Sequence, residues 1–223
     1  MLIQEGKALR QRDKISKEEL DGAMDKRFSP EIHEKLNEAA VVIVGLGGLG
    51  SHIAVMLART GIGHIHLIDF DKVDVTNLNR QAYVISDLGE YKTIALKNHL
   101  MEINPYLNIT YDTVKVTEDN VLSLLEGYAV VCEAMDNPEY KAMLVNTLLE
   151  QRPYIKIVAG SGMAGYDSSN KIITKRVMKN LYLCGDSEND AYVGIGLMAG
   201  RVSICAGHQA NMIVRLILGL EDA

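Results

Sequence analysis

The chain has 223 residues, of which 48% are hydrophobic and 23% are charged, and its formal net charge is −6 at pH 7. This length and composition are typical of a soluble globular protein with one large domain, which can bury its core without disulfides. The negative charge argues against nucleic acid as the main partner, because neutralising phosphates requires a basic surface.

The cysteines and the apolar stretches indicate the compartment. Cys132, Cys184 and Cys205 are odd in number and lack metal-pair spacing, so we expect free thiols in a reducing, cytoplasmic environment. Residues 1–30 are charged and do not have the apolar core of a signal peptide. The apolar stretch 195–220 contains polar side chains, which excludes a membrane helix and predicts a buried one. These side chains belong to Arg201, His208, Gln209, Asn211 and Arg215.

Residues 1–38 are polar and helix-prone, and they are predicted to form an N-terminal helical arm outside the main domain, residues 39–223. Ser16 and Glu19 have the spacing of a capping box ahead of Leu20. Two roles are open for the arm: a surface appendage, or an element that joins two copies of the chain.

From residue 39 onward, short apolar runs alternate with segments of helical periodicity. This alternation predicts an α/β fold with a doubly wound, mostly parallel sheet of the Rossmann-like type. The predicted strands are 39–44, 65–68, 108–114, 128–132 and 154–159, and the predicted helices are 51–60, 92–103, 118–125 and 138–151.

The alternation ends after the strand 154–159. Residues 171–177 and 181–184 are predicted to form a small antiparallel extension of the sheet. An acidic, glycine-containing loop is expected at 185–196, followed by a long final helix at 198–218.

A glycine-rich turn joins the first predicted strand to the following helix. Gly45, Gly47 and Gly50 form the pattern G-x-G-x-x-G, which in a strand–turn–helix setting is typical of a nucleotide-binding loop. The first glycine allows a tight turn, the second lets a phosphate approach the backbone, and the third lets helix and strand pack closely. The free N–H groups of the helix N-terminus attract an anion. Gly48 lies in the same turn, and the Ser51 hydroxyl can add a donor.

Asp69 ends the second predicted strand. It lies about twenty residues after the glycines, where a carboxylate usually accepts hydrogen bonds from ribose hydroxyls. Up to this point, the pattern fits an NAD-dependent oxidoreductase as well as an ATP-binding enzyme.

Three charged residues further along the chain distinguish these two classes. Arg80 lies in the loop after the second strand, Lys92 opens the next predicted helix, and Asp136 follows the strand 128–132. A dehydrogenase does not need these groups. In a triphosphate site, Arg80 and Lys92 balance phosphate charge and Asp136 holds Mg²⁺. The Walker-A pattern G-x-x-x-x-G-K is absent, so this is not a P-loop site.

Together, these motifs resemble the ThiF and MoeB adenylyltransferases of the ubiquitin-activating superfamily. The resemblance extends over about residues 27–220 and rests on the turn GLGGLGS, the stretch D-x-D-x-V-D-x-x-N-L-N-R-Q from Asp69, and Lys92 and Asp136. It implies adenylation of the C-terminal glycine of a small ubiquitin-like sulfur carrier ending in Gly-Gly. ATP and Mg²⁺ would be the cofactors and pyrophosphate the product. It also implies a homodimer and, as a first interpretation, a role in thiamine biosynthesis.

The resemblance assigns roles to individual residues. Gly45 and Gly47 line the nucleotide loop, Asp69 holds the ribose, Lys92 contacts phosphate, and Asp136 lies at the metal.

The loop after the second strand supplies the remaining candidates. By the same resemblance, Asn77 and Arg80 face the phosphates, with Gln81 as their neighbour. Asn79 and Gln81 either bind the nucleotide or brace the loop, and the same two alternatives are open for Asp71.

Two departures from the family pattern matter. The two C-x-x-C pairs that hold structural zinc in MoeB-like members are absent, so no zinc site is expected. Many members also have an N-terminal R-[YF]-x-R-Q segment, whose second arginine reaches the ATP site of the neighbouring subunit. Here Arg27 fits the first position but Pro30 replaces the second arginine, so either Arg27 substitutes or the site functions without it.

The cysteines and a second glycine cluster leave alternatives open. Some ThiF-like proteins link a loop cysteine covalently to the carrier. Cys184 either has this role or packs at a strand end, and its acidic surroundings favour packing. Cys132 and Cys205 are expected to be inert core residues. The segment Gly160-Ser161-Gly162 either holds an extended diglycine tail or is a simple linker.

Three other functions remain to be tested. A tRNA threonylcarbamoyladenosine dehydratase is the nearest alternative, and it would require a basic face. An NAD-dependent oxidoreductase and a non-catalytic binding module are the others. From the composition, neither a nucleic acid nor a membrane is expected as a partner.

Overall fold

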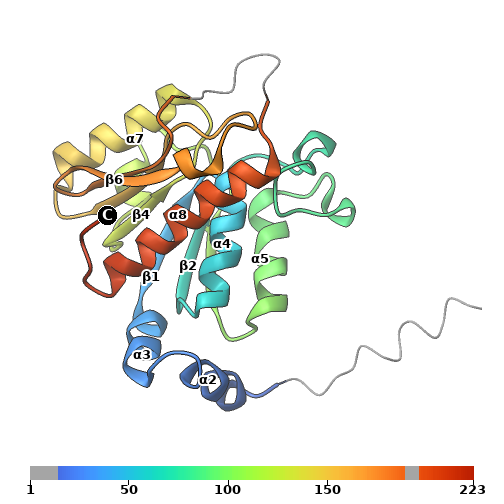
Figure 1. The fold of residues 1–223 in the computed structure, drawn as a ribbon. Coiled ribbons are helices and arrows are strands. Elements are labelled where there is room, and N and C mark those ends of the chain that lie inside the picture. The colour runs from blue at the N-terminus through green and yellow to red at the C-terminus, as the bar shows by residue number, and fades with distance from the viewer. Residues whose placement is uncertain (1–14, 189–195) are drawn as a thin grey trace, which may run out of the picture.

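The computed structural model describes residues 15–188 and 196–223, so the predictions for 1–14 and for most of the 185–196 loop lie outside the described residues. Seven strands form one sheet in the order β3-β2-β1-β4-β5-β7-β6, with helices on both faces (Figure 1). Neighbouring strands are parallel except β6 and β7, which are antiparallel. The predicted doubly wound α/β fold with a small antiparallel extension is confirmed.

The elements have the following bounds. The strands are β1 (Ala40–Val44), β2 (His64–Ile68), β3 (Asn108–Asp112), β4 (Val130–Glu133), β5 (Lys156–Gly160), β6 (Ile173–Met178) and β7 (Leu181–Gly185). The α-helices are α2 (Lys17–Asp25), α3 (Pro30–Glu38), α4 (Gly48–Thr60), α5 (Lys92–Ile103), α6 (Val121–Leu124), α7 (Pro138–Gln151) and α8 (Ala199–Ile217). The 3-10 helices of the described residues are η1 (Val75–Asn77), η2 (Ile85–Asp87) and η3 (Ser169–Lys171). Within the described ranges, none of the helices has the length and apolarity to cross a membrane.

Strand β1 shows why the sheet is buried on both faces. Val41 and Ile43 belong to an apolar cluster with residues of α4, α5 and α8, whereas Val42 and Val44 belong to a second cluster with residues of α6 and α7. Successive side chains of a strand point to opposite faces, so a strand between two helical layers is apolar throughout. Figure 1 shows α4, α5 and α8 on one face of the sheet and α7 on the other.

The order of the strands reverses beside β1. The chain runs outward through β2 and β3, returns to β4 on the other side of β1, and continues to β5. The carboxyl ends of β1 and β4 therefore lie side by side, with Val44 paired to Glu133. At such a switch point, the connections diverge and open a crevice in which doubly wound proteins bind their ligands.

Two helices differ in length from the prediction. Helix α4 begins at Gly48 rather than at Ser51, because Gly47 and not a later residue is its N-cap. Helix α6 covers only part of the predicted 118–125. Before it, the Asn120 side chain binds the backbone of Thr117 and Lys115, and such local bonds favour a turn over a helix.

The described part of the N-terminal arm consists of α2 and α3. The capping box of Ser16 and Glu19 is present, and Leu36 of α3 is buried in the core. The backbone of Asn37 lies against Gly63, where a Cβ on residue 63 would be 1.7 Å from the Asn37 carbonyl oxygen. The arm therefore packs near the C-terminal end of α4, away from the glycine-rich turn. The domain boundary stays a prediction.

Candidate functional site

Close backbone approaches require two of the glycines in the turn. Gly45 has φ +90°, and a Cβ on it would lie 2.8 Å from the Ala134 carbonyl and from the Met135 nitrogen. A Cβ on Gly50 would lie 1.8 Å from the Gly45 oxygen, so α4 packs on the turn only with glycine at that position. The loop after β4 thus lies directly against the glycine-rich turn.

The first turn of α4 offers backbone donors to a ligand. Gly47 is its N-cap, and in the described part of the chain no side chain caps this helix. The closest atom to a Cβ on Gly47 would be the Gln81 Nε2, 3.9 Å away, whereas Gly48 faces the Val202 Cγ1 at 2.9 Å. One side of the turn is therefore filled by α8 and the other is open. Uncapped N–H groups and the helix dipole make this end attractive to an anion.

Two polar side chains beside the turn, those of Ser51 and Gln81, are buried. The Ser51 hydroxyl donates to the Gly47 oxygen (2.7 Å) and accepts from the Ala82 nitrogen (3.1 Å). Gln81 is 7% exposed, and within the described residues its buried Oε1 has no hydrogen-bond partner. Ser51 therefore braces the turn, and direct nucleotide contacts of these two residues stay predictions.

Asp69 ties the turn to the second strand. Its Oδ2 accepts the Leu46 amide (2.6 Å) and its Oδ1 accepts the Asp71 amide (2.8 Å). Burial raises the pKa of this carboxyl, while the positive charge of Lys92 opposes the shift. Asp69 thus lies in the crevice where the resemblance puts the ribose, and the ribose contact itself stays a prediction.

Lys92 is the first residue of α5 and is only 6% exposed. Its Nζ lies 2.8 Å from the Asp71 Oδ2, and its amide donates to the Asp71 oxygen (3.0 Å). A buried lysine needs a compensating charge, and Asp71 supplies it. Asp71 thus braces Lys92 in this structure, and a nucleotide contact of Asp71 stays a prediction.

The loop after β2 holds Arg80 over the turn. The Asn77 Oδ1 accepts the Asp74 amide (3.0 Å), which fixes the start of η1. The Arg80 Nη1 donates to the Thr76 oxygen (3.0 Å) and to the Asn79 Oδ1 (2.9 Å). Asn77 and Asn79 both brace this loop. The Arg80 Nε is buried and, among the described residues, has no partner.

Asp136 completes the set from the other side of the switch point. It is exposed, follows β4 by three residues, and makes no hydrogen bond or ion pair within the described ranges. Its neighbour Asn137 caps α7 by accepting the amides of Glu139 and Tyr140. The structure therefore places Arg80 beside Gly48, Lys92 beside Asp71 after β2, and Asp136 in the loop that lies against Gly45. Their joint action on a nucleotide stays a prediction.

The single carboxylate of Asp136 suits a Mg²⁺ ion that is shared with a substrate phosphate better than a metal ion held by protein side chains alone. Mg²⁺ prefers oxygen and usually takes one or two carboxylates together with substrate phosphates. In residues 15–188 and 196–223, no group of three or more His, Cys, Asp or Glu side chains could hold a metal ion. A Mg²⁺ shared with a bound phosphate is compatible with this arrangement. The expected lack of a zinc site stays a prediction.

A buried ion pair beneath Asp136 was missed by the sequence analysis. Glu133 is fully buried, pairs with Lys141, and accepts the Met135 amide (2.7 Å). Lys141 also donates to the Gly160 oxygen (2.9 Å). Burial raises the pKa of Glu133, which the charge of Lys141 opposes. The only sequence signal was a carboxylate at the end of an apolar strand. The pair fixes the loop that carries Asp136.

Cys184 lies at the end of β7 and is fully buried, as are Cys132 and Cys205. Burial raises the pKa of the Cys184 thiol to about 11. A buried, protonated thiol is a poor nucleophile, so the geometry favours packing over a covalent link.

Arg27 lies in the turn between α2 and α3 and is exposed. This turn belongs to the arm, at the end of the domain opposite to the glycine-rich turn (Figure 1). Arg27 is therefore remote from the glycine-rich turn of its own chain, and both alternatives stay open: that it serves the site of a second copy, or that the site functions without it.

Comparison with known proteins identifies the family. A model of the ThiF family matches residues 21–223, and the chain therefore belongs to the ThiF family. The sulfur carrier protein adenylyltransferase of Thermus thermophilus is 35% identical over 127 residues, which cover 55% of this chain and 47% of that protein. The chain thus spans about half of that relative.

Other relatives have different named functions. The molybdopterin-synthase adenylyltransferase of Salmonella typhimurium is 29% identical over 195 residues, covering 85% of this chain and 77% of that protein. The tRNA threonylcarbamoyladenosine dehydratase of Escherichia coli is 37% identical over 146 residues, covering 65% and 54%. A crystal structure of the E. coli dehydratase TcdA with ATP superposes with a TM-score of 0.83 at 25% identity, covering 92% of this chain and 97% of that one.

Proposed function

We propose that the chain binds ATP and uses it to activate a carboxylate by adenylation, with release of pyrophosphate. The observation that carries the proposal is the convergence of Arg80, Lys92 and Asp136 on the glycine-rich turn at the β1–β4 switch point. Membership in the ThiF family and the ATP complex of a related structure support it.

The chemistry needs positioning more than proton transfer. A C-terminal carboxylate has a pKa of about 3.5, so it is already an anion at neutral pH and requires no general base. The difficulty is to bring two anions together and to stabilise the charge that develops on the attacked α-phosphate. Arg80 and Lys92 supply fixed positive charge, and the N–H groups of α4 supply dipoles. Mg²⁺ held by Asp136 would supply further charge neutralisation when bound.

The proposed substrate is a small ubiquitin-like sulfur carrier that ends in Gly-Gly, with thiamine biosynthesis as its first candidate pathway. The adenylyltransferase relatives support the carrier. Gly160 itself offers no free edge to an extended tail, because β5 is paired with β4 on one side and with β7 on the other. The exposed outer strand β6 is a candidate surface for the carrier body.

The test is ATP–pyrophosphate exchange with purified carriers that end in Gly-Gly from the same cell. We expect exchange that depends on both the carrier and Mg²⁺. Exchange with none of these carriers would rule out the substrate proposal. A carrier with its last glycine deleted is the control, because it has the docking body but lacks the reacting carboxylate position.

A tRNA threonylcarbamoyladenosine dehydratase activity is the second candidate, supported by the similarity to the E. coli enzyme. The net charge of −6 argues against it. Binding of tRNA that weakens steeply as salt rises would favour this activity over the carrier. Tight NAD binding without ATP binding would instead favour an oxidoreductase.

A further inference from the structure

A buried ion pair joins the start of α8 to the end of β7. The Arg201 and Asp186 side chains are 4% and 1% exposed, and the Arg201 Nη2 pairs with the Asp186 Oδ2. Burying two charges costs more solvation than a well-packed apolar pair would, so such a pair is weak support for stability alone. The contacts of the pair instead indicate which segments it holds in place.

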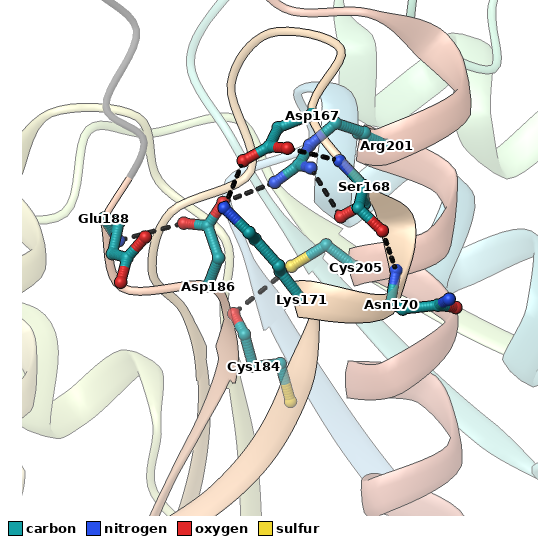
Figure 2. A network of polar contacts seen from close by, with 9 residues as sticks. All are labelled: Asp167, Ser168, Asn170, Lys171, Cys184, Asp186, Glu188, Arg201 and Cys205. Carbon is teal, nitrogen blue, oxygen red and sulfur yellow. Dashed lines mark hydrogen bonds and ion pairs between the residues drawn. The ribbon is translucent and has the colours of Figure 1, made fainter.

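The pair connects three segments that are far apart in the sequence (Figure 2). The Arg201 Nη1 donates to the Ser168 oxygen (2.9 Å), and the Asp186 Oδ1 accepts the Glu188 amide (2.9 Å). The Asp186 amide donates to the Gly162 oxygen (2.9 Å). Gly162 has φ +76°, and a Cβ on it would lie 2.2 Å from the Asp186 Oδ1. The loop after β5 therefore packs directly against the ion pair.

The first turn of α8 also touches the candidate nucleotide site. Val202, next to Arg201, fills the space beside Gly48, where its Cγ1 lies 2.9 Å from the position of a Cβ. The Leu197 oxygen accepts from the Asn79 Nδ2 (3.4 Å), and the Asn79 Oδ1 accepts from Arg80. One short stretch of chain thus contacts both Gly48 of the glycine-rich turn and Asn79, which holds Arg80.

We propose that Arg201 is a positioning residue. It holds the first helical turn of α8 against the glycine-rich turn, and it links the glycine-rich turn through α8 to the loop after β5. The proposal rests on the proposed function only in that the turn binds a nucleotide. Removing the ion pair would loosen the support behind Gly48 and Arg80, and ATP would bind more weakly.

The experiment compares Arg201→Met with Arg215→Met in the full chain. Methionine keeps the length of the stem and removes the charge. Arg215 is the matched control, because it lies in the last turn of the same helix and pairs with Asp222 away from the site. Arg201→Lys keeps the positive charge but replaces the forked guanidinium with one ammonium group, so it should show a smaller loss than Arg201→Met.

The first measurement is amide hydrogen exchange, which does not depend on activity. The Gly45 and Ser51 amides are hydrogen-bonded, so they report on the turn. For Arg201→Met we expect their exchange to rise by about fivefold or more, with no change in β2 and β3. A rise confined to 161–168 and 185–188 would overturn the proposal, and so would a uniform rise over the chain.

The second measurement is ATP affinity by calorimetry, which we expect Arg201→Met to weaken by about fivefold or more and Arg215→Met to leave within about twofold. If Arg201→Met does not fold, the double variant Asp186→Asn/Arg201→Met is used in its place, because it removes both charges of the ion pair and leaves none of them buried alone. If the wild-type chain does not bind ATP, the proposed function fails, and the exchange pattern alone decides the role of Arg201. Unchanged ATP affinity in a well-folded variant would contradict the proposal.

Discussion

The charged residues of the crevice differ in the freedom that their surroundings leave them. Lys92 and Asp69 are 6% and 9% exposed, and backbone or side-chain partners hold each of them. Asp136 is exposed and has no bonding partner in the described part of the chain. Substitution of the first two would therefore affect folding and activity together, whereas Asp136 separates the two effects.

Asp136→Asn should lower the rate of pyrophosphate exchange by about a hundredfold or more, because it removes the charge proposed to hold Mg²⁺. The free energy of unfolding should change by less than about 0.5 kcal/mol, since the side chain is exposed and makes no hydrogen bond or ion pair with the residues that the structure describes. Steady-state kinetics and urea unfolding measure the two effects. Asp119→Asn, at another exposed position, is the control. Activity within a few-fold of wild type would remove the metal role.

The three thiols should react very slowly with iodoacetamide in the native protein at pH 8. Burial raises the pKa of Cys184 to about 11 and that of Cys205 to about 12, and it raises the pKa of Cys132 as well. Only about one Cys184 thiol in a thousand is then ionised. Mass spectrometry before and after unfolding gives the comparison. Rapid modification of Cys184 alone, or loss of exchange activity in Cys184→Ala, would revive a covalent role.

At the scale of elements, the contact between the glycine-rich turn and α4 determines the shape of the site. Glycine is required at position 50 by the Gly45 oxygen and at position 45 by positive φ and the loop after β4. A side chain at either position would push the helix N-terminus away from the crevice. These two elements therefore tolerate little change in their relative position.

Gly50→Ala should destabilise the fold by about 3 kcal/mol or more, because the new Cβ would overlap the Gly45 oxygen. Gly207→Ala is the matched control within a helix. Nothing lies within 4 Å of its Cβ position, so the substitution should stabilise by about 0.5–1 kcal/mol through lower chain entropy in the unfolded state. Chemical denaturation measures both variants. Equal stabilities would show that the turn relaxes easily.

At the scale of the whole molecule, the loop between β2 and α5 exposes several large apolar side chains. Their exposed fractions range from 42% to 76%, and they belong to Phe70, Val75, Val84, Ile85 and Leu88. Large exposed apolar side chains that share one loop are candidates for an interface. This surface is a candidate interface for the expected homodimer. In such a dimer, Arg27 of one copy would be available to contact the other copy.

Sedimentation equilibrium should show a dimer at micromolar concentration. Ile85→Asp should weaken self-association by about tenfold or more, because it buries a charge in an apolar contact. Tyr154→Asp, at an exposed aromatic position outside this loop, should leave it unchanged. A monomeric wild-type chain would contradict the homodimer, and equal effects of the two variants would rule out this surface.

Most strands, most helices and the charged candidates of the site followed from the sequence, because local patterns encode them. A strand buried on both faces must be a continuous apolar run, and a turn that packs against a helix must contain glycine. The runs at Val41–Val44 and the glycines at 45, 47 and 50 carry these requirements in a few neighbouring residues. The start of α4 was predicted too late, because Gly48 and Gly50 are poor helix formers that this packing nevertheless demands.

The strand order and the buried ion pairs were decided only by the tertiary structure. Nothing local in the sequence shows that β4 returns beside β1, although this step brings Asp136 to the turn that follows Val44. Likewise Arg201 was interpreted only as a polar interruption of an apolar helix, and Glu133 lay just outside the predicted strand 128–132 with no role assigned. Glu133 and Lys141 are 8 residues apart and Arg201 and Asp186 are 15 apart, in different elements, and only the folded chain brings these opposite charges together out of water.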